Sequence, residues 1–272
     1  MNRREVKKHE IRQAAIIKNS IRRRRKRRRL KIQFYLALLF IFLSIIGVLA
    51  YTVLFPAKKI TVMGECKYNA VEIIEVSEIK IGKSIFQIDT NAVKSRIETR
   101  LTYIETAKVS RKLPFEVLIE VSAAVPRYAC KFEGSYLLAS ETGKILEIVA
   151  DKPEGVTIIS GLKLNNPKSG HYIEFLDMDQ KYVFDQLKQG ISSRLLDINF
   201  IDLSDIVDIQ LIYENRILIN LGSSIDLDYK LAHVAAVLKE LDQSEEGTLN
   251  LKYWAENNQQ SFFKKEKIDI SY

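Results

Sequence analysis

The sequence predicts an α+β protein with a single transmembrane helix, a unit of order strand, helix, helix, strand, strand, and a second, mainly antiparallel β unit with helices. Three observations indicate this class. Residues 32–55 carry no charge, the following 70 or so residues alternate between strand and helix periodicity in that order, and residues after 126 hold mostly short period-two runs. The expected boundaries are a basic tail at 1–31, the transmembrane helix at 32–55, the two units at 56–125 and 126–255, and a polar C-terminal tail at 256–272.

The apolar run is long enough to cross a bilayer. Its 24 residues, from Ile32 to Phe55, extend about 36 Å as a helix, and the hydrocarbon core is about 30 Å thick. Tyr35 and Tyr51 lie near the two expected interfaces, where aromatic rings are common. Pro56 is expected to end the helix.

A dense basic run before the helix sets the expected orientation. Residues 1–31 contain 15 Lys or Arg and two Glu, a net charge of +13, whereas all later residues sum to −5. The positive-inside rule therefore predicts a single-pass type II protein with a cytoplasmic N-terminus and an extracytoplasmic C-terminal region. The same charges favour contact with anionic lipid headgroups. The membrane-orienting residues are Arg22, Arg23, Arg24, Arg25, Lys26, Arg27, Arg28, Arg29 and Lys31.

Three other interpretations fit this junction less well. A cleaved signal peptide has an apolar core of about 7–15 residues, shorter than this run, although Val48-Leu49-Ala50 offers a cleavage site. The Arg28-Arg29 pair matches a twin-arginine signal, but any dense arginine run supplies such a pair. Nucleic-acid binding by the tail is not expected, because no aromatic residues are interleaved with the charges.

The first unit shows clear helix and strand signals. Asn69 with Glu72 forms a capping-box pattern, and Val93, Ile97 and Leu101 fall four apart on one helical face. The expected elements are a strand at Lys59–Met63, a helix from Asn69 through Ser77, a helix capped by Thr90, and strands at Ile104–Arg111 and Phe115–Val121 joined by a turn at Lys112–Pro114.

The second unit is expected to be mostly strand. Period-two runs and turn residues predict hairpins, and apolar residues at helical spacing predict two helices. The expected elements are the hairpin of Tyr136–Ala139 with Lys144–Ile148, a strand at Val156–Ser160, a helix at Tyr182–Leu196, the hairpin of Asp208–Tyr213 with Arg216–Leu221, a helix from Tyr229 to Leu241, and a last strand at Thr248–Trp254. The tail that follows is expected to fray.

Taken together, this order of elements resembles a known family. The segments Ile60–Gly64, Ile81–Asp89 and Ile104–Pro114 resemble a POTRA domain placed after a transmembrane anchor, as in the FtsQ/DivIB cell-division family. Asn220–Gly222, the helix from Tyr229 and Thr248–Trp254 resemble the C-terminal β domain of that family. The resemblance covers about residues 20–255.

The resemblance implies a non-enzymatic divisome scaffold at the division septum. Its partners would be membrane-anchored division proteins similar to FtsB or DivIC and to FtsL, and it would help assemble or regulate septal peptidoglycan synthesis. In the family, the C-terminal strand region contacts these partners. The positions that match it, and hence the predicted partner-binding residues, are Thr248, Leu249, Asn250, Leu251, Lys252, Tyr253 and Trp254.

Physical reasoning points to the same segment. A last strand leaves unpaired backbone groups to which a partner strand adds, and Tyr253 and Trp254 would supply aromatic anchors. An alternative is that both rings pack inward, because Tyr253 shares a strand face with Leu249 and Leu251.

Few residues suggest catalysis. The three histidines, among them His171 and His233, have no partners at catalytic or metal-ligand spacing, and no phosphate loop or nucleophile motif is present. The pairs Asp202-Asp205 and Glu245-Glu246 are expected to be solvated. We therefore expect no enzymatic activity, no metal, no cofactor and no small-molecule substrate. A chaperone or translocation module for polypeptides is the alternative function.

The two cysteines lie 64 residues apart and do not form a metal-ligand pair. Cys66 and Cys130 are both on the expected outer side of the membrane, where a disulfide is chemically allowed. Two free or partly buried thiols are the other possibility, and the sequence leaves both open.

Overall fold

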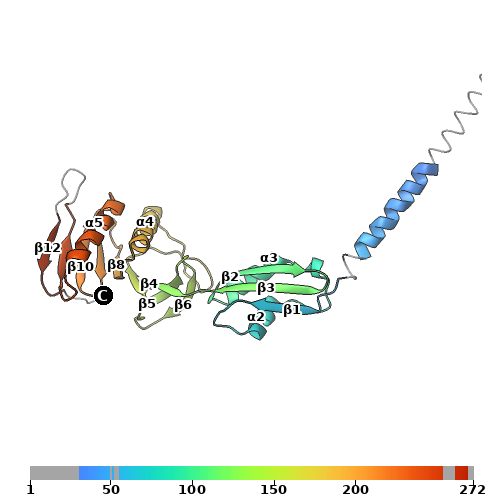
Figure 1. The fold of residues 1–272 in the computed structure, drawn as a ribbon, viewed down its shortest axis with the longest axis horizontal. Coiled ribbons are helices and arrows are strands. Elements are labelled where there is room, and N and C mark those ends of the chain that lie inside the picture. The colour runs from blue at the N-terminus through green and yellow to red at the C-terminus, as the bar shows by residue number, and fades with distance from the viewer. Residues whose placement is uncertain (1–30, 50, 52–54, 254–260, 269–272) are drawn as a thin grey trace, which may run out of the picture. The chain divides into compact units, whose positions relative to one another are not determined.

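The computed structural model describes residues 31–49, 51, 55–253 and 261–268. Contacts between residues group the chain into two compact units. From here on, the first and second units are these two, and not the units of residues 56–125 and 126–255 that the sequence predicts. The first comprises Met1–Lys59, Lys80–Asp89 and Arg111–Val117, and the second comprises Ile60–Ile79, Thr90–Ser110 and Leu118–Tyr272. Figure 1 shows the elements coloured along the chain. The domain boundaries expected from the sequence remain predictions.

The N-terminal apolar segment is helical. The helix runs from Lys31 to Leu49 and has a mean hydropathy of 2.5, and none of its residues is buried within the chain (Figure 1, blue). It has the length and composition of a membrane span. Residues 22–29 and part of the predicted span, at 50 and 52–54, lie outside the described residues.

The next part of the chain has the expected order of strand, helix, helix, strand, strand. Its elements are β1 (Lys59–Met63), α2 (Ala70–Ser77), the short 3-10 helix η2 (Ile85–Gln87), α3 (Thr90–Arg100), β2 (Ile104–Lys112) and β3 (Glu116–Ala123). The three strands form a sheet of order β1-β3-β2. The predicted capping box is present at α2, where the Glu72 amide donates to Asn69 Oδ1 at 3.0 Å and the Asn69 amide donates to Glu72 Oε2 at 2.8 Å.

Within the first unit, three chain segments that are distant in sequence are tied by hydrogen bonds. The amide of buried Ala57 donates to the Lys83 carbonyl at 2.8 Å, and the Lys58 amide donates to the Phe115 carbonyl at 2.8 Å. The Arg111 guanidinium donates to the carbonyls of Ile85, at 2.9 Å, and Ile88, at 2.7 Å. The loops on either side of η2 and between β2 and β3 are therefore held together as one end of this unit.

The second unit contains a nine-stranded mixed sheet of order β12-β11-β10-β9-β8-β7-β4-β5-β6. Pairing is parallel between β10 and β11, between β4 and β7, and between β7 and β8, and antiparallel elsewhere. The sheet is thus mainly antiparallel, as predicted. Its strands are β4 (Pro126–Phe132), β5 (Ser135–Ser140), β6 (Ile145–Val149), β7 (Thr157–Ser160), β8 (Ile198–Asp202), β9 (Ile209–Tyr213), β10 (Ile217–Gly222), β11 (Gly247–Asn250) and β12 (Phe262–Lys265).

Two helices cover one face of this sheet: α4 (Met178–Arg194) and α5 (Leu227–Glu240) (Figure 1). Buried Leu187 and Leu231 join strand residues such as Ile219 in one apolar core. Gly190 allows the two helices to approach, because a Cβ there would lie 2.4 Å from Leu231 Cδ1. Glycine is a poor helix former, but Gly190 is needed here for the packing of α4 on α5.

Some element boundaries differ from the prediction. Helix α4 begins at Met178 rather than Tyr182, because the Asp177 carboxylate caps the amides of Asp179 and Gln180. It ends where Leu195 adopts a left-handed conformation with φ of 54°. Strands β4 and β8, which were not predicted, lie on either side of β7 in the sheet interior.

Candidate partner-binding edge

The segment predicted to be the last, edge strand is paired on both sides. Its regular part is β11, which pairs in parallel with β10 through Ile217↔Gly247 and Asn220↔Asn250. On the other side it pairs antiparallel with β12, through Gly247↔Lys265 and Asn250↔Phe262. The expectation that Thr248–Trp254 ends the sheet is therefore wrong, as is the expectation of a frayed tail at Phe262–Lys265.

Strand β12 folds back because one of its side chains completes the core. Phe263 lies opposite Leu249 and is half-buried against the main apolar cluster. Gly247 provides the room, since a Cβ there would lie 2.3 Å from the Lys264 carbonyl oxygen and 2.8 Å from Phe263 Cζ. Half-buried Phe263 stands between exposed Phe262 and exposed Lys264, a half-buried strand pattern that is too short to stand out in sequence.

Polar contacts also hold β12 in place. His233 on α5 is half-buried, and its Nε2 lies 2.8 Å from Oγ of Ser261, the residue that directly precedes the strand. Lys265 forms an ion pair with Glu245. The hydrogen bond from Lys265 lowers the pKa of the Glu245 carboxyl, and the same contact raises the pKa of Lys265.

The predicted partner-binding residues divide into three groups. Leu249 and Leu251 are buried, so they support the sheet rather than meet a partner. Thr248 and Asn250 are half-buried. Tyr253 is 77% exposed because the strand has ended before it, so its ring does not pack inward; Lys252, also exposed, pairs with Asp208 at 3.1 Å. Trp254 lies outside the described residues.

Among the described residues, β12 pairs only with β11 and forms one end of the sheet order. The opposite end, β6, is partly covered, because the Ile145 amide donates to the His171 carbonyl at 2.9 Å and Ile145 accepts from the Gly170 amide at 2.7 Å. The open edge is thus β12, which begins eight positions after Trp254, the last residue of the segment chosen from sequence. Phe262, on this strand, is 64% exposed. The one sequence signal for it is the Phe262-Phe263 pair in an otherwise polar tail.

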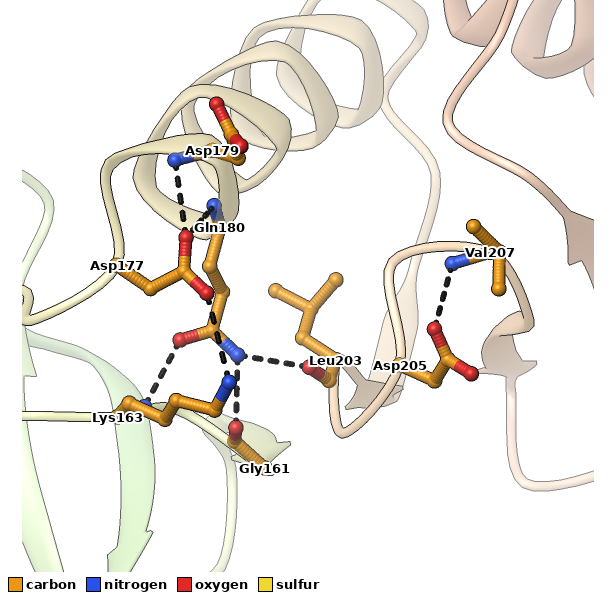
Figure 2. Close-up of polar contacts among 8 residues, drawn as sticks. All are labelled: Gly161, Lys163, Asp177, Asp179, Gln180, Leu203, Asp205 and Val207. Atoms are coloured by element: carbon orange, nitrogen blue, oxygen red, sulfur yellow. Dashed lines mark hydrogen bonds and ion pairs between the residues drawn. The ribbon is translucent and has the colours of Figure 1, made fainter.

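A polar cluster near the carboxyl ends of the parallel strands β7 and β8 is structural rather than a ligand site (Figure 2). The buried Gln180 amide donates to the carbonyls of Gly161, at 2.7 Å, and Leu203, at 2.8 Å, and its Oε1 accepts from the Lys163 amide at 2.8 Å. Each polar atom of this side chain has a protein partner. Nearby, Asp205 Oδ1 accepts from the Val207 amide at 2.9 Å. The cluster therefore fastens α4 to two strand ends.

Buried charged and nucleophilic groups also serve the fold. Burial lowers the pKa of Lys144 and Lys230, and both ammonium groups donate to backbone carbonyls, Lys144 to Ile104 and Lys230 to Leu221. Both cysteines are free thiols. Burial raises the pKa of Cys130 to about 12, which keeps its thiol protonated and unreactive. Among the described residues, no group of three or more His, Cys, Asp and Glu side chains is placed to hold a metal ion.

Comparison with known proteins agrees with this architecture. Residues 55–122 match the family described as POTRA domain, FtsQ-type. This match defines the class as a protein with an FtsQ-type POTRA domain, and the apolar helix before the domain fits a membrane anchor. The chain is 27% identical over 225 residues to a cell division protein DivIB of Clostridium botulinum, covering 80% of this chain and 87% of the relative.

Further relatives carry the same two names. A cell division protein DivIB of Clostridium tetani is 25% identical over 209 residues, which cover 73% of this chain and 77% of that protein. A cell division protein FtsQ of Corynebacterium glutamicum is 27% identical over 128 residues, which cover 46% of this chain and 56% of that protein. The resemblance to the FtsQ/DivIB family is thereby confirmed.

Proposed function

We propose that this protein is a non-enzymatic scaffold of bacterial cell division that binds membrane-anchored partners through the free edge of β12. The observation that carries the proposal is the position of β12 at the end of the nine-stranded sheet, where β11 is its only partner strand among the residues that the structure describes. A partner segment in extended conformation would add there as a further strand. The names of the relatives, cell division proteins DivIB and FtsQ, support the division role.

In this proposal the residues predicted to bind partners have different roles from those expected from the sequence. Phe262 on β12 and Tyr253, three residues after the end of β11, have exposed aromatic rings, and aromatic residues tend to dominate interface energies. Thr248 and Asn250 lie opposite Lys264 and Phe262 in the strand register, so they border the docking edge from inside the sheet. The partners would be of the FtsB or DivIC and FtsL kinds, and the scaffold would help assemble or regulate septal peptidoglycan synthesis.

The membrane topology belongs to the same proposal. The basic run at 22–31 would hold the N-terminus in the cytoplasm and contact anionic lipid headgroups there, leaving the sheet on the outer side. The protein would concentrate at the division septum. A fluorescent fusion should therefore label midcell. An even distribution around the envelope would instead favour the alternative, a chaperone or translocation module for polypeptides.

Pull-down with the full-length chain tests the edge. Replacing Tyr253 and Phe262 by Ala should reduce recovery of membrane-anchored division proteins, with circular dichroism unchanged. Tyr182→Ala is the matched control, because Tyr182 is an exposed aromatic residue on α4, and the start of α4 is bonded to the ends of β7 and β8, which are not neighbours of β12 in the sheet. Equal recovery from the edge variant and the control would contradict the proposed interface.

A further inference from the structure

The first compact unit ends in a small surface made of two loop tips. One tip is Lys80–Lys83, before η2, and the other is Lys112–Phe115, between β2 and β3. Both are joined by backbone hydrogen bonds to the chain at Ala57 and Lys58, where it enters the unit. Each tip carries an exposed aliphatic side chain: Ile81 is 64% exposed and Leu113 is 66% exposed. We call this set of residues the entry face.

The entry face is strongly basic. The described residues of the first unit after the helix hold six Lys or Arg and two acidic residues, a net charge of +4. All other residues beyond 31 sum to −9, because the total there is −5. The exposed lysines are Lys58, whose Nζ lies 4.2 Å from the centroid of the Phe115 ring on the second tip, and Lys80, Lys83 and Lys112. Lys59 pairs with Glu116 at 3.8 Å, and Arg111 is engaged with backbone carbonyls, so neither adds to this set.

The entry face lies close to the bilayer because the chain is short between it and the helix. Eight residues from Leu49 to Ala57 span at most about 29 Å when fully extended. Contacts within the unit shorten this further. The Phe86 ring of η2 lies 5.4 Å from the Phe55 ring and 6.3 Å from the Tyr51 ring, and Ser84 Oγ donates to the Tyr51 carbonyl at 2.5 Å.

We propose that the entry face docks on the outer surface of the same membrane, with Ile81 and Leu113 inserted among anionic phospholipid headgroups. Apolar tips ringed by ammonium groups fit such a surface, because the side chains bury in the interface while the charges meet phosphates. Aromatic rings at Tyr51, Phe55 and Phe86 favour the same level of the bilayer. This site is separate from the β12 edge, so it stands or falls independently of the proposed partner binding.

The test uses the full-length protein in lipid nanodiscs. A Cys66→Ser background removes the half-buried thiol, and Cys130 stays protected in the core. A nitrobenzoxadiazole label is placed at position 81 or 113 through Ile81→Cys or Leu113→Cys, and quenching by aqueous iodide is measured. In discs containing phosphatidylglycerol, quenching should be roughly threefold slower than for a label at Val71→Cys, an exposed apolar site on α2.

Charge dependence completes the test. Protection should disappear in discs of phosphatidylcholine alone, in about 1 M salt, where the screening length falls to about 3 Å, and after replacing the four exposed lysines by Gln. Circular dichroism checks that the variant with four replaced lysines is folded. The single variant Lys80→Gln, which is less disruptive, should show a partial loss of protection. Quenching at 81 and 113 as fast as at 71 would overturn the proposal. Equal protection in neutral discs would overturn it as well, because the lysines would then play no part.

Discussion

His233 on α5 lies 2.8 Å from Ser261, the residue that leads into β12. This contact connects a helix of the core layer to the last strand of the sheet. It makes the free edge depend on a residue that is 28 positions away in sequence. The position of β12 can therefore be tested from the helix side, without touching the edge itself.

Replacing His233 by Ala should loosen β12. One hydrogen bond contributes about 1 kcal/mol net, so protection of the strand against hydrogen exchange should fall by roughly five- to tenfold. Exchange measured at amides 262–265, with α4 amides as an internal reference, checks this. Lys239→Ala, an exposed change on the same helix, should leave these amides unaffected. Equal exchange in both variants would show that the contact is not needed.

Gly247→Ala should displace β12 more strongly. The added Cβ would meet the Lys264 carbonyl oxygen and the Phe263 ring at 2.3 and 2.8 Å. Overpacking of this kind costs about 1–3 kcal/mol. Chemical denaturation should show a small loss of global stability, and partner pull-down should fall although no exposed residue has changed. Normal pull-down would mean that the partner does not need β12 in place.

Gln180→Leu should destabilise the nine-stranded unit by about 2–4 kcal/mol. The change leaves the carbonyls of Gly161 and Leu203 and the amide of Lys163 without their partner (Figure 2). Gln186→Leu is the matched control, because Gln186 lies on the same helix and its amide contacts only the exposed Tyr182 hydroxyl, at 3.1 Å. Urea midpoints for the two variants should differ clearly. Similar midpoints would contradict a structural role for the Gln180 cluster.

The attachment of β12 should depend on pH through Glu245 and Lys265. The hydrogen bond from Lys265 lowers the pKa of Glu245, so this contribution is present above about pH 4.3 and is lost as pH falls through the folded-state pKa. The pKa of Lys265 is raised, so its contribution is present below about pH 10.4 and is lost as pH rises through its folded-state pKa. The attachment is therefore expected to be most stable between about pH 5 and pH 10.

The amide resonances of β12 itself, at residues 262–265, report on this attachment in the full chain. They should keep their positions across that range and move at both extremes. Glu245→Gln removes the charge pair and should flatten the profile. A profile that is identical in wild type and Glu245→Gln would contradict the assignment.

Local signals in the sequence predicted the elements well where they were self-contained. Asn69 with Glu72 marked the start of α2, and the Glu214-Asn215 turn between β9 and β10 has φ values of 47° and 51°, as a tight hairpin requires. These features depend on residues a few positions apart. Sequence periodicity is sufficient for them.

The elements that escaped prediction depend on distant partners. Strand β8 lies between β7 and β9, where neighbours on both sides replace the alternation that marks a half-exposed strand. Strand β12 has four residues, and its stability comes from Phe263 reaching the core over Gly247 and from the contact of His233 with Ser261. The candidate edge was therefore placed one strand too early, although in the correct region of the chain.

Site-specific crosslinking in living cells tests the central claim most directly. A photoreactive amino acid at position 262 or 264 of the full-length protein should capture a membrane-anchored division protein, identified by mass spectrometry. The same probe at position 182 on α4 or at position 148 on β6, both exposed, should not. Capture of that protein from 148 or 182 but not from 262 or 264 would contradict binding at the free edge of β12.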